Sequence, residues 1–567
     1  MYMAHFHTKM KKGRPYLYVR EIKRVNGKPK VVSQVYIGSP ERVRDLVRSA
    51  GDEEATLHTE EWGSLFVANQ ADRDIDLVEI VDSVIPHLSR EKGPSVGEYF
   101  LYAVLNRMVD PQSKHSLPEW YARTAIQTIR PTEIGELTSE RYWYKWDRVS
   151  EADLEKIARM FFEKVWAREK TEPDCVLFDT TNYYTYMSTS TVSDLAKRGK
   201  NKDGKHHLRQ VGLALLVARG NRLPLFYRPY PGNVHDSREF EKIMDEILAV
   251  VCGFAGTKKR LTLVMDKGMN SEDNLACIDD SGIVHFITTY SPYFADDLAT
   301  IPLEKFSPID VGRNEEEPLM AYRTTGEFWG RNRSVVVTYN PRTARKQEYV
   351  FEAKLEELRK ELLAMRAKVN NGEVQWRDQE SVIERYHRLC EKLHVSSALY
   401  ELTFEEEDGL KMGFRLNAYR VSRTRISFGK SIVVTDNTDW STEEIVRTHI
   451  DRYQVEMEFR QSKAADQVSV MPVRHWTDSK IRCHLFTCVV AMTYLRLLEL
   501  DLERAGIKRT ASDVIEELRS LDSVLTIPKG ARTPRRRLAT PSKTQALVLH
   551  ALGYSIDGRG VLQQGHL

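Results

Sequence analysis

The segment "DCVLFDTTNYYTYM", residues 174–187, joins an apolar run to a single carboxylate. Residues 175–178 are hydrophobic throughout, as expected of a strand buried on both faces, and Asp179 follows them directly. A polar stretch of threonines, an asparagine and tyrosines comes next. An ordinary strand that reaches the surface has this pattern, and so does a strand that supplies one carboxylate to a metal site. The metal interpretation requires partner carboxylates at matching places elsewhere in the chain.

The segments that follow alternate between strand-like and helix-like patterns. Continuous apolar runs predict strands, and apolar residues at three- and four-residue spacing predict helices. The predicted strands are 175–179, 209–219, 223–232, 260–266 and 283–290, and the predicted helices are 236–251 and 271–281. This order of three strands, helix, strand, helix and strand predicts an α/β fold that begins like a ribonuclease-H-like catalytic core. In that fold the first and fourth strands are neighbours.

A second carboxylate, Asp266, stands at the end of the fourth predicted strand, "LTLVMD". Since this strand and the first are expected to be neighbours, Asp179 and Asp266 should meet at one edge of the sheet. Two close carboxylates repel each other unless a cation lies between them. Hard divalent ions such as Mg²⁺ take oxygen ligands and meet this demand. The two strand ends therefore predict a metal site.

A third carboxylate is expected on the helix predicted at 441–463, which contains "HIDRYQVEMEFRQSK". Glu456 and Glu458 are both candidates, but side chains two residues apart on a helix point about 200° apart, so only one can face the metals. Arg452 and Lys463 lie close to the stripe of Glu456, where their charges suit DNA phosphates. We therefore choose Glu456.

These segments together resemble the DDE transposases of bacterial insertion sequences, in the group whose third catalytic segment carries a Tyr–Arg–Glu–Lys signature. The resemblance covers roughly residues 74–500. Its segments are "FDTTNYYT", "GLALLVARGNRLPLFYRPYPGNVHDSREF", "LVMDKGMNSEDNL", and "RYQVEMEFRQSK" followed by "VRHWTDSKIRCHLFTCVVAM". One position departs from the signature, because His449 stands where the tyrosine is expected, seven residues before Glu456.

The resemblance implies an enzyme that cuts the ends of an insertion sequence and transfers the cut strands into target DNA. It implies two-metal phosphoryl transfer with Mg²⁺, for which Mn²⁺ could substitute. The implied catalytic metal ligands are Asp179, Asp266 and Glu456, and the implied DNA contacts on the third segment are His449, Arg452 and Lys463. The implied partner is double-stranded DNA, as inverted-repeat ends and as target. A homodimer on DNA is expected because two ends must be held together.

Two other functions remain open at this point. One is a ribonuclease-H-like DNA nuclease without strand transfer. The other is a domesticated, non-catalytic DNA-binding protein, which would be expected to have lost at least one carboxylate. All three candidate carboxylates are present, so the last alternative ranks below the others.

Basic residues gather in three segments although the net charge is only +3. Residues 1–48 hold 12 Lys and Arg against 3 acids, residues 196–210 hold six against one Asp, and residues 526–543 hold six and no acid. A solvated face would explain any one of them, but three together favour a polyanion such as nucleic acid. The candidate DNA contacts in the last two segments are Lys205, His207, Arg209, Arg535, Arg536 and Arg537.

Changes of pattern divide the chain into six regions. They are a small basic β module with an Asn26-Gly27 hairpin turn (1–70), a helical DNA-binding region (71–170), the first part of the core (171–290), a helical and β-rich insertion domain (291–436), the catalytic-Glu helix and end of the core (437–500), and a helical, basic C-terminal region (501–567). Ser95, Ser150 and Ser441 are predicted helix caps.

Composition excludes several classes of protein. The chain of 567 residues is 41% hydrophobic and 29% charged, and it contains no apolar run of about 18 residues that would predict a transmembrane helix. Its start has no apolar stretch of the signal-peptide type. None of the six cysteines forms a C-x-x-C pair, which argues against a zinc ribbon. We expect a protein of the bacterial cytoplasm, associated with the nucleoid when bound to DNA and not with a membrane.

Overall fold

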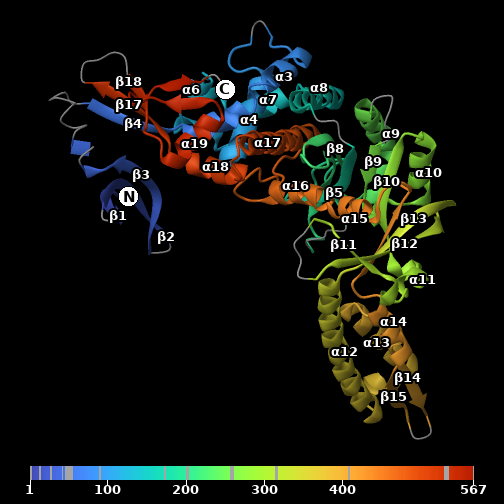
Figure 1. The fold of residues 1–567 in the computed structure, drawn as a ribbon. Coiled ribbons are helices and arrows are strands. Elements are labelled where there is room, and N and C mark those ends of the chain that lie inside the picture. Colours follow the sequence, from blue (N-terminus) through green and yellow to red (C-terminus); the bar gives the residue numbers. More distant parts are fainter. Residues whose placement is uncertain are drawn as a thin grey trace. The chain divides into compact units, whose positions relative to one another are not determined.

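The computed structural model describes residues 3–11, 14–25, 28–40, 43–44, 55–88, 91–170, 174–199, 204–255, 261–312, 317–406, 409–528 and 535–565. The chain forms two compact units, whose elements are labelled in Figure 1. Unit 1 holds residues 1–171, 180–234 and 456–567, and unit 2 holds residues 172–179 and 235–455. Strand β5 (Cys175–Thr185) and helix α16 (Tyr453–Lys463) have residues in both units. None of the helices in the described ranges is long and apolar enough to cross a membrane.

Unit 2 is built on a mixed sheet. Its strands, in hydrogen-bonded order, are β11 (Ser307–Ile309), β12 (Leu319–Phe328), β13 (Arg331–Tyr339), β16 (Lys430–Thr435), β10 (Val284–Tyr290), β9 (Leu261–Val264) and the first half of β5. β9 runs parallel to both its neighbours, with Leu263 opposite Val176 on β5 and opposite Phe286 on β10. The first and fourth strands of the prediction are therefore neighbours, as expected. Helices α9 (Asp236–Ala255) and α10 (Glu272–Ser281) precede and follow β9.

Strand β5 continues past Asp179 to Thr185, whereas the sequence predicted that it ends at the aspartate. The polar side chains of this second half are accommodated because they find partners within unit 1. Thr185 Oγ1 donates to the carbonyl of Val473 at 2.6 Å, and the hydroxyl oxygens of Tyr183 and Ser462 lie 2.7 Å apart. Asp179 is therefore held in the middle of a strand and not in a turn.

The segment predicted as an insertion domain has two parts. Strands β11, β12, β13 and β16 extend the sheet of unit 2. The remaining elements are α12 (Pro341–Asn370), α13 (Gln379–Leu393), β14 (Tyr400–Glu405), β15 (Lys411–Leu416) and α14 (Ala418–Ile426). They enclose a hydrophobic cluster of their own, with Leu358 and Leu362 from α12 and Val382 and Tyr386 from α13. Helices α12 and α13 thus form the main helical part of the predicted insertion domain.

Two helices occupy residues 441–463, where the sequence predicted one. Helix α15 (Thr442–Ile450) and helix α16 are separated by a turn at Asp451 and Arg452. The Arg452 N–H donates to the His449 carbonyl at 3.2 Å, so this bond spans three residues instead of four. The spacing of apolar residues in the sequence does not reveal such a short break between two helices.

Unit 1 begins with an antiparallel sheet of β1 (Met3–Lys11), β2 (Arg14–Val25) and β3 (Lys28–Gly38), shown in blue in Figure 1. Val25 pairs with Lys28 as the predicted hairpin requires, while Asn26 and Gly27 lie outside the described residues. Strand β7 (Arg209–Ala218) pairs with β6 (Lys197–Arg198) and with β8 (Pro224–Pro231).

The helices of unit 1 pack around α17 (Asp478–Arg504), which is buried over most of its length and contacts α4, α7 and α8. The other helices are α2 (Gly63–Gln70), α3 (Leu77–Val84), α4 (Val96–Val109), α5 (Leu117–Ala122), α6 (Ile126–Ile129), α7 (Ser139–Trp146), α8 (Glu151–Glu169), α18 (Ala511–Leu518) and α19 (Lys543–Ala551). The three predicted caps are present, because Ser95, Ser150 and Ser441 each accept from the backbone N–H three residues on.

The C-terminal region contains strands that the sequence did not predict. Strand β17 (Asp522–Pro528) pairs with β18 (Arg535–Leu538) on one side and with β4 (Ala55–Glu61) on the other. Strands β19 (Tyr554–Ile556) and β20 (Leu562–Gln564) form a further hairpin. Residues 55–61, which the sequence assigned to the N-terminal module, therefore complete a sheet made with the other end of the chain.

Candidate active site

Asp179 and Asp266 approach one guanidinium group in unit 2. An Oδ2 atom of Asp179 lies 3.7 Å from Arg452 Nη1, and Asp266 Oδ1 lies 3.8 Å from Arg452 Nη2. Asp179 comes from β5, Asp266 lies two residues beyond the end of β9, and Arg452 stands in the turn between α15 and α16. The parallel pairing of β5 with β9 thus brings the two predicted carboxylates to the same cation.

The donor set of this site suits a hard divalent ion. Two carboxylates that lie close together repel each other. Here the Arg452 guanidinium lies near both Asp179 and Asp266 and compensates their negative charge. Their side chains remain 15% and 40% exposed, respectively, so solvent ions can reach them. Within the described part of the chain, no group of three His, Cys, Asp or Glu is already assembled as a metal site. The predicted third ligand, Glu456, belongs to unit 1.

The two glutamates considered for the third position differ sharply in environment. Glu456 is exposed in the first turn of α16, whereas Glu458 is only 2% exposed and its Oε2 has no hydrogen-bond partner. Desolvation by burial raises the pKa of Glu458 to about 7, so a large share of this side chain is uncharged at neutral pH. An exposed carboxylate is the more accessible of the two as a metal ligand, so Glu456 stays the predicted third ligand.

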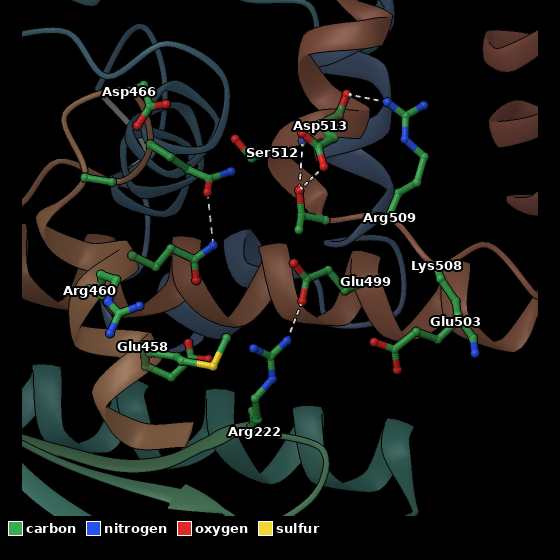
Figure 2. Close-up of a pocket in the computed structure, with 15 residues that line it drawn as sticks. Arg222, Glu458, Arg460, Asp466, Glu499, Glu503, Lys508, Arg509, Ser512 and Asp513 are labelled. Carbon is green, nitrogen blue, oxygen red and sulfur yellow. Dashed lines mark hydrogen bonds and ion pairs between the residues drawn. The ribbon is translucent and has the colours of Figure 1, made fainter. Parts of the chain in front are cut away.

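Glu458 lines a pocket of about 950 Å³ in unit 1 (Figure 2). Arg222 and Glu499 form an ion pair in this pocket, with Arg222 Nη2 2.7 Å from Glu499 Oε2. Arg496 also pairs with Glu499, at 2.8 Å. These two arginines lower the pKa of Glu458 while Glu499 raises it, but burial has the largest effect. The side chain of Glu458 thus lines this pocket together with charged residues of α17 and of the turn between β7 and β8.

His449 occupies the position where a tyrosine was expected. It is the penultimate residue of α15, one turn before Arg452. Desolvation and the positive charge of Arg452 lower the pKa of His449 to about 4, although Asp266 raises it. The imidazole is therefore neutral at physiological pH and has one ring nitrogen to donate and one to accept a hydrogen bond. A cationic contact of His449 with phosphate is not supported by this environment.

Lys463 and Lys205 lie against tyrosines that follow Asp179 on β5. Lys463 Nζ is 5.8 Å from the centre of the Tyr183 ring, and Lys205 Nζ is 3.8 Å from the centre of the Tyr184 ring. Tyr183 itself is fully buried. Both lysine residues are partly exposed and lie beside an aromatic face.

The other predicted DNA contacts divide into exposed and internally engaged side chains. His207, Arg535 and Arg537 are exposed. Arg209 instead donates through both terminal nitrogens to the carbonyls of Thr191 and Thr189, at 2.7 Å and 2.6 Å. Arg536 forms an ion pair with Glu60 on β4 and donates to Ser523 Oγ at 2.9 Å. Arg209 and Arg536 therefore stabilise the loop and the sheet in which they lie.

One contact with the segment that follows α16 escaped the sequence-based prediction. Arg107, buried at the end of α4, donates to the carbonyls of Val468 and Ser469 at 3.3 Å and 3.0 Å. Both of these residues have positive φ, 57° and 48°, a conformation that is unfavourable for a β-branched side chain. Arg107 thus holds a strained segment that begins five residues after the end of α16 at Lys463. Arg107 and Val468 are 361 residues apart in the sequence. A contact between such distant residues leaves no local sequence pattern.

The mixed sheet thus brings Asp179 and Asp266 close to one guanidinium group. The chain belongs to the transposase DDE domain family, whose model matches residues 171–494, more than half of the 567 residues. The matched range contains Asp179, Asp266 and Glu456.

A similar solved structure is the cryo-EM structure of a piggyBac transposase synaptic complex with hairpin DNA. It is 8% identical in sequence, has a TM-score of 0.36, and the similarity covers 82% of each chain. No curated protein sequence matches this chain.

Proposed function

We propose that the protein is an active DDE transposase that cleaves the ends of a bacterial insertion sequence and joins them to target DNA. The observation that carries this proposal is the convergence of Asp179 and Asp266 on one guanidinium, at 3.7 Å and 3.8 Å, within the matched family region. Such a pair of carboxylates can hold a divalent ion once the guanidinium gives way. A domesticated DNA-binding protein would have no reason to keep this arrangement.

The proposed metal ligands are Asp179, Asp266 and Glu456, with Mg²⁺ as the natural ion and Mn²⁺ as a substitute. When bound, such ions polarise phosphoryl oxygens and lower the pKa of attacking water or hydroxyl. The chain's own residues have separate roles. Arg452 neutralises the two aspartates in the free protein and, with Lys463, attracts phosphates of the scissile strand. His449, held neutral, donates one hydrogen bond to a phosphate oxygen or a base.

The sheet supports a ribonuclease-H-like classification of the catalytic core. In that fold a central first strand is followed in the sheet by parallel strands four and five, and β5, β9 and β10 have this order and direction. The proposed partner is double-stranded DNA, as inverted repeats and as target, and the proposed assembly on DNA is a homodimer. Exposed basic residues such as Arg535 and Arg537 suit this polyanion.

The test is a cleavage and joining reaction with purified full-length protein, Mg²⁺, and a labelled duplex that carries the inverted repeats flanking the gene. Nicked ends covalently joined to a target plasmid are the expected products. Asp179→Asn should abolish both steps while duplex binding is kept, and Asp174→Asn, five residues earlier, is the matched control that should remain active. Cleavage without joining would assign a nuclease instead, and full activity of Asp179→Asn would remove the metal-site assignment.

A further inference from the structure

The N-terminal sheet of β1, β2 and β3 has two chemically different faces. Side chains alternate across a strand, and residues directly opposite each other on paired strands share a face. The pairs on one face are His7–Tyr18, Lys9–Tyr16, Tyr18–Tyr36 and Arg20–Gln34. We call this set of seven residues, His7, Lys9, Tyr16, Tyr18, Arg20, Gln34 and Tyr36, the tyrosine face.

Contacts between these side chains confirm that they share one side. The Tyr36 ring lies 5.8 Å from the Tyr16 ring and 5.2 Å from the Tyr18 ring, centre to centre. Lys9 Nζ lies 5.8 Å from the centre of the Tyr18 ring. Arg20 Nε donates to Gln34 Oε1 at 2.7 Å. The result is a row of three rings with a guanidinium–amide pair beside it.

The charge of the tyrosine face is entirely positive. Glu21 is the only acid among residues 1–38, and its place in the strand puts it on the opposite face. That opposite face carries apolar side chains such as Leu17, Val19 and Val35. The apolar side chains are therefore segregated from the tyrosine face, which has the composition of a polar binding surface. Tyr36 is 48% exposed on it.

Duplex DNA is the partner that this chemistry fits. A β-ribbon enters the major groove, where an arginine reads guanine and a glutamine reads adenine. Arg20 and Gln34 stand side by side on adjacent strands and can address neighbouring base edges. Tyrosine hydroxyls and a lysine supply contacts to the flanking phosphates. The excess of 12 basic over 3 acidic residues in residues 1–48 complements the charge of the backbone.

We propose that the tyrosine face of β1–β3 binds the double-stranded ends of the mobile element, with Arg20 and Gln34 at base edges and Lys9 at a phosphate. This inference rests on the proposed function, because it assigns to a particular sheet the recognition step that a transposase requires.

The experiment measures binding of the full-length protein to a fluorescent inverted-repeat duplex and to a scrambled duplex, by anisotropy over a range of salt concentrations. Arg20→Ala should lose roughly tenfold in affinity for the repeat and much less for the scrambled duplex. Arg20→Lys should keep the salt dependence and lose the preference between duplexes, because an ammonium cannot make a bidentate contact. Lys9→Ala should reduce the magnitude of the slope of log K against log salt by about 0.9 for both duplexes.

Lys360→Ala, which removes one exposed cation from α12 of the insertion, is the matched control and should leave both affinities unchanged. Circular dichroism and thermal melting verify that each variant is folded. The inference would be overturned if Arg20→Ala and Lys9→Ala kept the wild-type affinity, the wild-type slope of log K against log salt and the wild-type preference for the repeat duplex. It would also be overturned if the wild-type protein did not bind duplex DNA. If the variants behave as expected but the wild-type protein neither cleaves nor joins DNA, only the proposed catalytic function fails.

Discussion

Removal of the Arg452 guanidinium should have opposite effects on metal affinity and on DNA cleavage. In the free protein this group lies 3.7 Å from Asp179 and 3.8 Å from Asp266, in the place where a divalent ion would compensate the same charges. A metal that binds must therefore displace the guanidinium or remain close to its positive charge. Arg452→Ala removes this competitor, and it also removes a cation expected to hold DNA phosphate.

The size of the effect follows from the two contacts. Coulomb's law for a separation of 3.7 Å gives about 4 kcal/mol at an effective dielectric constant of about 20, and about 1 kcal/mol in water. The Asp179 and Arg452 side chains are 15% and 21% exposed, while Asp266 is 40% exposed and strongly screened. After desolvation is subtracted, a net value of about 1 to 2 kcal/mol is reasonable. Divalent affinity should therefore rise about tenfold, since about 1.4 kcal/mol corresponds to that factor.

The assay is titration of the full-length protein with Mn²⁺ in the absence of DNA, followed by electron paramagnetic resonance of the free ion. Arg452→Lys should bind Mn²⁺ as the wild-type protein does, because the charge is kept. Arg447→Ala is the matched control, since Arg447 on α15 pairs with Glu444 and donates to the carbonyl of Asp310. The same Arg452→Ala protein should cleave DNA more slowly. Weaker Mn²⁺ binding in Arg452→Ala than in wild type would refute the competition between guanidinium and metal.

Three further predictions concern stability and positioning. Burial raises the pKa of Asp72, whose Oδ1 accepts from the Tyr494 hydroxyl, to about 6, so the folded state holds this proton more tightly than the unfolded state. The free energy of unfolding should therefore lose a contribution of about 3 kcal/mol as the pH rises from below 4 to above 6, and urea titrations should find this contribution missing in Asp72→Asn. Leu358→Ala, in the separate core of α12 and α13, should cost about 2 to 5 kcal/mol locally, and hydrogen exchange should speed up in the insertion while β5 and β9 stay protected. Arg107→Met should leave the carbonyls that follow α16 unsatisfied, lower the free energy of unfolding by about 3 kcal/mol and slow cleavage; an unchanged cleavage rate in the folded variant would show that this segment does not position Glu456.

Local patterns were sufficient to predict most elements, including the two apolar runs that precede Asp179 and Asp266. The apolar runs at 175–178 and 261–264 are buried because both faces of their strands are covered, and a run of this kind is visible without any partner. Helix caps such as Ser95 and Ser150 act on the backbone three residues away, so they too are visible locally. The pairing of the first and fourth predicted strands was predicted from the order of strands and helices along the chain, since parallel strands require a crossover connection.

The continuation of β5 past Asp179 was decided by the tertiary structure, because its polar residues become acceptable only beside Val473 and Ser462. The break between α15 and α16 and the pairing of β4 with β17 also lack a local signal. The sequence by itself determined which carboxylates are available and on which strands they lie. Only the fold decided that Asp179 and Asp266 share Arg452 and that Glu458 is buried, because charge compensation and desolvation depend on side chains from distant parts of the chain.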